Sequence, residues 1–291
     1  MTFPFATRAP TSAEVEAIRL MLSTFRDGSG TERDGDGTTR PNWRQIERVF
    51  AELFTGEPAP ENKGIFDVTV PSLDDPKLLY GLSIKSKQLP KRQFDRLSVD
   101  SRTYMEVANS PAKMFDALHA NHGIGVQDFI DGRDPDVIGN CVLKTINEWH
   151  EEGKKQYERL HHARRIDLDH SVYICLSYRQ WDDSAPRRFQ IHSFSLQFPE
   201  NIRWRYKGKA LRGYDPKHPG EVIFDWYAQS GGQLKYYPRA SDALFSSAPF
   251  VLEELQNIDL YERAHQYWER EWLAVQRELH PSLVRRNLKE G

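Results

Sequence analysis

Apolar residues recur at helical spacing in two stretches near the start of the chain. Residues 11–26 carry one apolar stripe, and Thr11 and Glu14 are spaced for a capping box at its start. A second stripe covers residues 41–54, from Pro41 through Trp43 to Phe54, with proline suited to the first turn. Between them, residues 27–40 are rich in Gly and Asp but lack EF-hand spacing, which predicts a solvated linker rather than a calcium loop.

Strand patterns begin at residues 64–85, where two short apolar runs flank a connection containing Pro71 and Pro76. Residues 86–100 read as a basic loop, and residues 101–118 as a helix with a break or kink at Pro111. Further along, the pattern predicts a mostly helical segment at 136–162, strands at 172–178, 189–198, 202–206 and 221–227, and a closing helix at 242–280.

This order of helices and strands predicts a mixed fold of the α/β or α+β class, with a central mixed β-sheet flanked by helices. The length of 291 residues allows one domain with a large core. We therefore expect a single domain over residues 1–291, with its core at about 40–200. A β-rich addition at about 201–240 and the helix at about 242–280 complete it.

Composition limits which cellular compartment and which binding partners we expect. The net charge is −2, so any nucleic-acid-binding surface has to be local rather than general. Only Cys141 and Cys175 are present, far apart, which fits a reducing cytoplasm and argues against a disulfide framework or a zinc site. No apolar run approaches the length of a membrane span, so we expect a cytoplasmic protein that does not enter a membrane.

Candidate chemistry concentrates in the stretch 64–85. Asp67 is a carboxylate inside an otherwise apolar strand, and Ser83 and Lys85 share one face of the next strand because they are two residues apart. If the two strands are neighbours, Asp67 and Lys85 meet. A carboxylate can hold a hard divalent ion, and a lysine beside it can orient a water or stabilise developing charge on a phosphoryl group.

One carboxylate alone would bind magnesium poorly, so a second has to come from another element. Glu106, on the helix expected at 101–118, could reach back over the strand ends. Glu47 lies on the margin of the apolar stripe of its helix, where a carboxylate requires a partner or a metal. The competing interpretation places Asp67 at a strand end and leaves Lys85 and both glutamates in solvent.

The order Glu47 on a helix, Asp67 on a strand, Ser83-Ile84-Lys85 on the next strand and then Glu106 resembles the PD-(D/E)XK nuclease superfamily. It is most similar to type II restriction endonucleases in which the active-site glutamate has moved from the Glu-x-Lys strand to a downstream helix. The resemblance covers about residues 40–120. Phe66 stands where the pattern has proline, and the separation of Lys85 from Glu106 is longer than usual.

The resemblance implies a restriction-endonuclease-like core and a Mg²⁺-dependent site. It implies Asp67 and Glu106 as metal ligands and Lys85 as the catalytic lysine, with Ser83 in the place of the strand glutamate. Glu47 would lie behind the ligands or bind a second metal ion.

Two further segments suit DNA contact. Arg92, Asp95 and Arg96 follow the catalytic strand, and Arg and Asp can read guanine and cytosine in the major groove; a surface ion pair is the alternative. Residues 201–240 interleave basic and aromatic side chains in a chain of slightly negative charge, which favours a polyanion over a solvated hairpin. The candidates there are Arg203, Arg205, Lys207, Lys209, Arg212, Gln233 and Lys235.

The sequence thus leads to the expectation of a Mg²⁺-dependent type II restriction endonuclease that cuts double-stranded DNA at a C/G-containing site. A homodimer is expected because cutting both strands of a symmetric site needs two active sites. A cognate DNA methyltransferase is expected as a neighbouring gene rather than a bound partner. The alternatives are a nuclease-like DNA-binding or regulatory protein without catalysis, and a defence or repair nuclease that recognises DNA structure.

Overall fold

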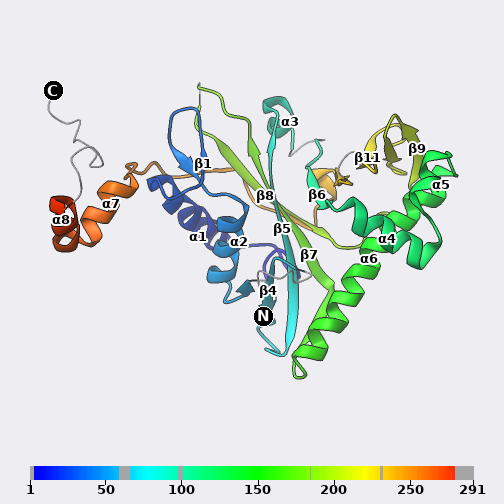
Figure 1. Cartoon of the computed structure of the whole chain (residues 1–291), viewed down its shortest axis with the longest axis horizontal. Helices are drawn as coiled ribbons and strands as arrows, with labels where there is room; N and C mark the ends of the chain where they lie inside the picture. Colours follow the sequence, from blue (N-terminus) through cyan, green and yellow to red (C-terminus); the bar gives the residue numbers. More distant parts are fainter. Residues whose placement is uncertain (1–2, 59–65, 98–100, 184, 230–231, 279–291) are drawn as a thin grey trace.

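A mixed β-sheet runs through the centre of the protein (Figure 1). The structure, a computed structural model, describes residues 3–58, 66–97, 101–183, 185–229 and 232–278. Within these residues, strands follow the order β13-β8-β7-β5-β4-β3, with β14 also paired to β8. The β5–β7 pair is parallel and the other pairs are antiparallel, which confirms the expected mixed sheet. The strands are β3 (Glu57–Pro58), β4 (Val68–Pro71), β5 (Leu78–Leu89), β7 (Arg165–Arg179), β8 (Arg188–Ser195), β13 (Phe245–Ser246) and β14 (Phe250–Val251).

Two hydrophobic clusters lie on the two faces of this sheet. On one face, α1 (Ser12–Ser23) and α2 (Trp43–Leu53) pack through Ile18, Leu22 and Phe50 against even-numbered side chains of β5. Both helices were expected, and both begin with a capping box, at Thr11–Glu14 and Asn42–Gln45. Trp43, expected on the apolar stripe of α2, is instead exposed because it lies in the first turn, outside the contact with the sheet.

The opposite face carries α6 (Pro135–Leu160) and a second, smaller sheet (Figure 1). The smaller sheet has the order β6-β12-β11-β10-β9, and all its pairs are antiparallel. Its inner face, which includes Trp204, Phe224 and Trp226, packs with α6 and two shorter helices. These elements are β6 (Met105–Ala108), α4 (Pro111–His122), α5 (Val126–Ile130), β9 (Arg203–Lys207), β10 (Ala210–Tyr214), β11 (Val222–Trp226) and β12 (Leu234–Tyr236).

The segment after Lys85 differs from expectation. Residues 86–89 continue β5, which remains paired with β7 up to Leu89↔Arg179, and α3 (Lys91–Asp95) follows, so the basic loop predicted at 86–100 was wrong for these residues. The helix predicted at 101–118 was wrong in its first half. Residues 105–108 form β6 because they pair with β12, and the helix α4 begins only at Pro111, its first residue.

Residues 27–40 are not a solvated linker. They contain the end of η1 (Thr24–Asp27) and the short ribbon β1 (Glu32–Arg33) and β2 (Thr39–Arg40). Asp34 is buried in this ribbon and forms ion pairs with Arg40 at 3.0 Å and with Arg187 at 2.9 Å. The Gly/Asp-rich composition therefore serves a docked ribbon rather than a flexible connection.

The C-terminal part is only partly helical, so the continuous helix predicted at 242–280 was wrong. After η2 (Ala240–Asp242), β13 and β14 add to the edge of the large sheet, where they cover β8. The helices α7 (Leu260–Tyr267) and α8 (Glu269–Glu278) then extend away from the body (Figure 1). None of the helices within the described ranges is long and apolar enough to cross a membrane.

Candidate active site

Asp67 directly precedes β4 and lies opposite the middle of β5. Its backbone N–H donates to the carbonyl of Leu82 at 3.0 Å, which places the side chain over the Ser83–Lys85 segment. Three donors converge on Asp67 Oδ2: Ile84 N–H at 2.6 Å, Lys85 Nζ at 3.0 Å and Ser83 Oγ at 3.4 Å. Among the described residues nothing donates to Oδ1, so this oxygen remains available to a further partner.

Strand alternation explains why these side chains meet. Ser83 and Lys85 point to the same face of β5, and in the parallel ladder they lie beside Tyr173 and Cys175 of β7. The Lys85 side chain is 24% exposed. The juxtaposition of Asp67, Ser83 and Lys85 that the sequence predicted is therefore present, at the boundary between a buried cluster and solvent.

Glu47 approaches this group from α2. The pairing of β4 with β5 begins at Val68↔Leu82, so β4 does not cover the edge of β5 at the residues that follow Leu82, which include Ser83 and Lys85. Burial and the negative charge of Asp67 raise the pKa of the Glu47 carboxyl to about 7, although Lys85 opposes the rise. Within the described part of the chain, Glu47 forms no hydrogen bond or ion pair. It is a half-buried carboxyl that faces another carboxylate, and the nearby positive charges of Lys85 and Arg44 only partly compensate.

His150, on α6, is a site residue that the sequence did not indicate. Its ring stacks on Phe66 with 5.9 Å between centroids and 7° between planes, and lies 6.1 Å from the ring of Tyr173. Phe66 itself lies over Gly81, where a Cβ atom would come within 2.2 Å of the ring. Burial and the positive charge of Lys85 lower the pKa of His150 to about 4. The imidazole near Lys85 is therefore neutral at neutral pH.

Glu106 does not join Asp67 in this way. It lies on β6 rather than on a helix, and it accepts hydrogen bonds from Lys87 Nζ at 2.7 Å and Tyr104 Oη at 2.8 Å. Burial opposes the shift, but these two donors hold the pKa of the Glu106 carboxyl below its usual range. Because Lys85 and Lys87 share one face of β5, two carboxylate–lysine pairs lie side by side about 7 Å apart along the strand.

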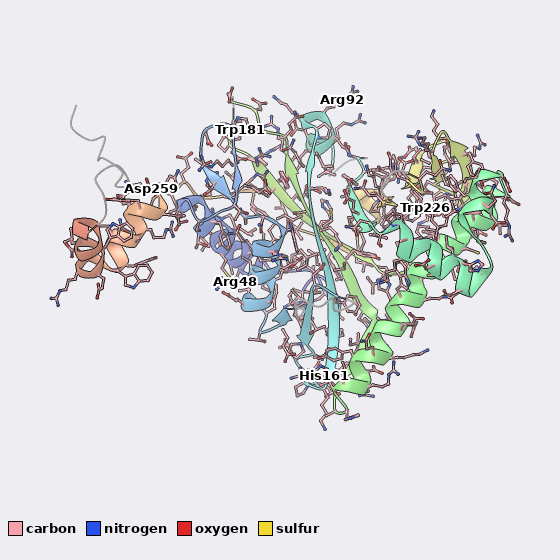
Figure 2. All side chains as sticks on the ribbon, in the orientation of Figure 1. Arg48, Arg92, His161, Trp181, Trp226 and Asp259 are labelled. Atoms are coloured by element: carbon pink, nitrogen blue, oxygen red, sulfur yellow. The ribbon has the colours of Figure 1, made fainter. Side chains whose placement is uncertain are left out.

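Arg92, Asp95 and Arg96, on and just after α3, are less suited to reading bases than the sequence suggested. Asp95 forms ion pairs through Oδ1 with Arg188 and, at 3.6 Å, with Arg179, so this oxygen already has partners. Arg92 and Arg96 are exposed on this short helix, and Figure 2 shows Arg92 at the end of β5. Base reading by these residues stays a prediction.

The basic residues of segment 201–240 divide into two groups. Arg203 is bound to Asp136 at 2.9 Å, while Lys207 and Lys209 are exposed around the β9–β10 turn. In contrast, Arg205, Arg212 and Lys235 occupy the sheet face opposite Trp226, which Figure 2 shows within the smaller sheet. Gln233 directly precedes β12 and is half-buried, and its carbonyl accepts a hydrogen bond from the N–H of Tyr227 at 2.9 Å.

Comparison with protein-family models gave no match, and comparisons with curated proteins and with solved structures gave none either. Within the described residues, no three His, Cys, Asp or Glu side chains are grouped so as to hold a metal ion. Function therefore has to be inferred from the chemistry of the Asp67–Lys85 pair and its neighbours.

Proposed function

We propose that this protein is a Mg²⁺-dependent nuclease that hydrolyses phosphodiester bonds of double-stranded DNA, in the manner of a type II restriction endonuclease with a C/G-containing site. The observation that carries the proposal is the Asp67–Lys85 pair at 3.0 Å beside the Glu47 carboxyl, which has no hydrogen-bond or ion-pair partner among the described residues. A carboxylate, a lysine and a second acid, held together by one strand pair and one helix, suit phosphoryl chemistry better than a purely structural role.

The donor set fits magnesium. Mg²⁺ prefers oxygen ligands and commonly uses one or two carboxylates together with water and substrate phosphate. Among the described residues neither Oδ1 of Asp67 nor the carboxyl of Glu47 accepts a hydrogen bond, and a cation between them would relieve the repulsion that raises the pKa of Glu47. We therefore propose Asp67 and Glu47 as the ligands, rather than Asp67 and Glu106. When bound, Mg²⁺ would polarise the phosphoryl group and stabilise the leaving oxygen.

The chain's own residues would divide the remaining tasks. Lys85, fixed by Asp67 Oδ2, orients the attacking water and donates to a phosphate oxygen. Ser83 and the Ile84 N–H hold the carboxylate in place so that Oδ1 faces outward. His150, kept neutral at physiological pH by burial and by the positive charge of Lys85, can accept a hydrogen bond from the water that Lys85 orients and so help to position it.

We further propose that the protein acts in the cytoplasm as a homodimer, since a symmetric duplex site needs two related active sites. Analytical ultracentrifugation with and without a DNA duplex tests this point. A monomer in both conditions would contradict the dimer while leaving the chemistry of the single site open to the cleavage assay.

A plasmid cleavage assay tests the chemistry. The wild-type protein is expected to convert supercoiled DNA to linear fragments only when Mg²⁺ is present, and Lys85→Ala is expected to slow cutting by about 10²-fold or more. Lys144→Ala is the matched control, because the Lys144 side chain is 67% exposed on α6 and, among the described residues, its ion pair is with Glu148 on the same helix. Equal rates for Lys85→Ala and wild type would refute the proposed site.

The principal alternative is a DNA-binding protein that has a nuclease-like core without catalysis. It predicts a DNA complex that persists in Mg²⁺ without nicking. A nuclease that recognises DNA structure predicts cutting without a fixed fragment pattern. The same assay on DNA of known sequence separates all three.

A further inference from the structure

A row of charged side chains crosses the outer face of the smaller sheet. The strand register places Arg205, Arg212, Asp225, Lys235 and Glu106 opposite one another, from β9 through β10, β11 and β12 to β6. Their neighbours in sequence, such as Trp204, Leu211 and Trp226, point to the inner face and are buried in the core. The 2.7 Å ion pair from Glu106 to Lys87 joins this row to β5. We call these six residues the charged row.

The charged row ends beside the candidate active site. Lys87 is two residues beyond Lys85 on the same face of β5. We propose that the charged row binds the phosphate backbone of the DNA that is cut at Asp67 and Lys85; this inference rests on the proposed nuclease function and locates its substrate. The row contains four basic and two acidic side chains, so it attracts a polyanion although the chain as a whole is slightly acidic.

The partners within the row assign different roles to its cations. Arg212 is held by Asp225 at 2.8 Å and Lys87 by Glu106, so both are already neutralised. Within the described residues Arg205 and Lys235 form no direct ion pair, although the charge of Lys235 favours the ionised forms of Glu106 and Asp225, its neighbours on the adjacent strands. Arg205 lies over the ring of Tyr214 at 5.3 Å, and Lys235 lies over that of Tyr227 at 4.5 Å.

Aromatic contact keeps a cation in place without neutralising it, so the donors of Arg205 and Lys235 remain available for phosphate. Tyr104 contributes to the same arrangement near the active site: Lys87 and Lys235 lie 5.1 and 5.6 Å from its ring centroid. The half-buried tyrosines thus position lysines along the path toward Lys85.

A hollow of about 360 Å³ lies at the far end of the charged row. Arg203, Arg205 and Tyr214 line it together with Asp215 and two prolines, so it has two cations, one carboxylate and apolar walls. Strands in a sheet are about 4.8 Å apart, so the row spans about 19 Å, or about five to six base pairs of duplex at about 3.4 Å each. The hollow is therefore placed to receive the backbone about that far from the scissile bond.

The test is a salt titration of DNA binding by the full chain in EDTA, so that no cleavage occurs. The probe is a fluorescein-labelled duplex longer than the charged row, read by anisotropy between about 50 and 200 mM salt. For Arg205→Ala/Lys235→Ala, the slope of log Kobs against log salt is expected to fall in magnitude by about 2, one for each lost phosphate contact. Lys144→Ala/Lys155→Ala, which removes two exposed lysines of α6, is expected to leave the slope unchanged.

A third variant separates this role of Glu106 from metal binding. Glu106→Gln frees Lys87 and is expected to tighten binding in EDTA without abolishing cleavage in Mg²⁺. Two results would refute DNA binding by the charged row. One is a salt slope unchanged in the Arg205→Ala/Lys235→Ala variant. The other is a larger decrease in slope for Lys207→Ala/Lys209→Ala, at the β9–β10 turn, than for that variant. Binding by wild type without any cleavage would instead overturn the nuclease function and leave the row intact. Circular dichroism of each variant confirms folding.

Discussion

Replacing Glu47 by glutamine should stabilise the metal-free protein at alkaline pH while abolishing its response to magnesium. The pKa of Glu47 is about 7 in the folded protein and 4.5 for an ordinary glutamate. The difference of about 2.5 corresponds to about 3 kcal/mol at about 1.4 kcal/mol per pKa unit. Because Glu47 is only half-buried, solvent screening reduces this to about 1–2 kcal/mol.

The direction follows from proton linkage. The folded state binds the Glu47 proton more tightly than the unfolded state, so wild type loses stability as pH rises from about 5 to about 8, and the glutamine variant does not lose this share. Urea unfolding in EDTA at both pH values measures the difference between the two proteins. Other titrating groups cancel in this difference.

Magnesium then provides the second half of the test. At about 100 times its dissociation constant it should stabilise wild type by about 2.7 kcal/mol and Glu47→Gln far less. Glu52→Gln is the matched control, because Glu52 lies on the same helix, exposed, and pairs with Arg48. Equal pH dependence for wild type and Glu47→Gln, together with equal stabilisation by Mg²⁺, would refute the placement of Glu47 against Asp67 and a cation.

Three further outcomes follow from buried charges and imidazoles. His150→Gln should slow single-turnover cleavage by about 10²-fold, whereas His192→Gln, whose pKa is also about 4 but which lies on β8 against Phe194, should not; equal rates would contradict a role for His150. Both imidazoles have a lower pKa when folded than when unfolded, so the unfolded state takes up their protons first and the melting temperature should fall as pH drops from about 6.5 to about 4. The variant that carries both His150→Gln and His192→Gln should show a smaller fall. Asp34→Asn should cost about 3–5 kcal/mol in urea unfolding because it leaves Arg187 buried without a counter-charge, while Asp36→Asn should cost less than about 1 kcal/mol.

The Asp67–Lys85 pair could be predicted from sequence because its geometry is local. Alternation along one strand places Ser83 and Lys85 on the same face, and an antiparallel neighbour brings Asp67 opposite them. The mixed sheet could be predicted for a similar reason, since its long strands carry clear apolar runs.

The position of Glu106 could not be predicted because its strand depends on a distant partner. β6 is four residues long and exists through its pairing with β12, which lies about 130 residues later. Without that partner, residues 105–108 read as the start of the helix that in fact begins at Pro111. Non-local pairing overrode local propensity here.

His150 could not be predicted from the sequence, for a different reason. It belongs to no motif, and nothing in its spacing distinguishes it from a solvated position on a long amphipathic helix. Its role depends on α6 packing against Phe66, which Gly81 permits by lacking a side chain. Similarly, the ion pair of Asp34 with Arg187 joins residues that are far apart in sequence, so composition alone indicated a linker.

The most direct test of the central claim is to digest a DNA of known sequence in Mg²⁺ buffer and to sequence the ends of the fragments. The proposed function predicts that all ends map to one short recurring site, and that Lys85→Ala produces no such ends under the same conditions. A stable protein–DNA complex that yields no ends in Mg²⁺, or ends that Lys85→Ala produces equally well, would contradict it.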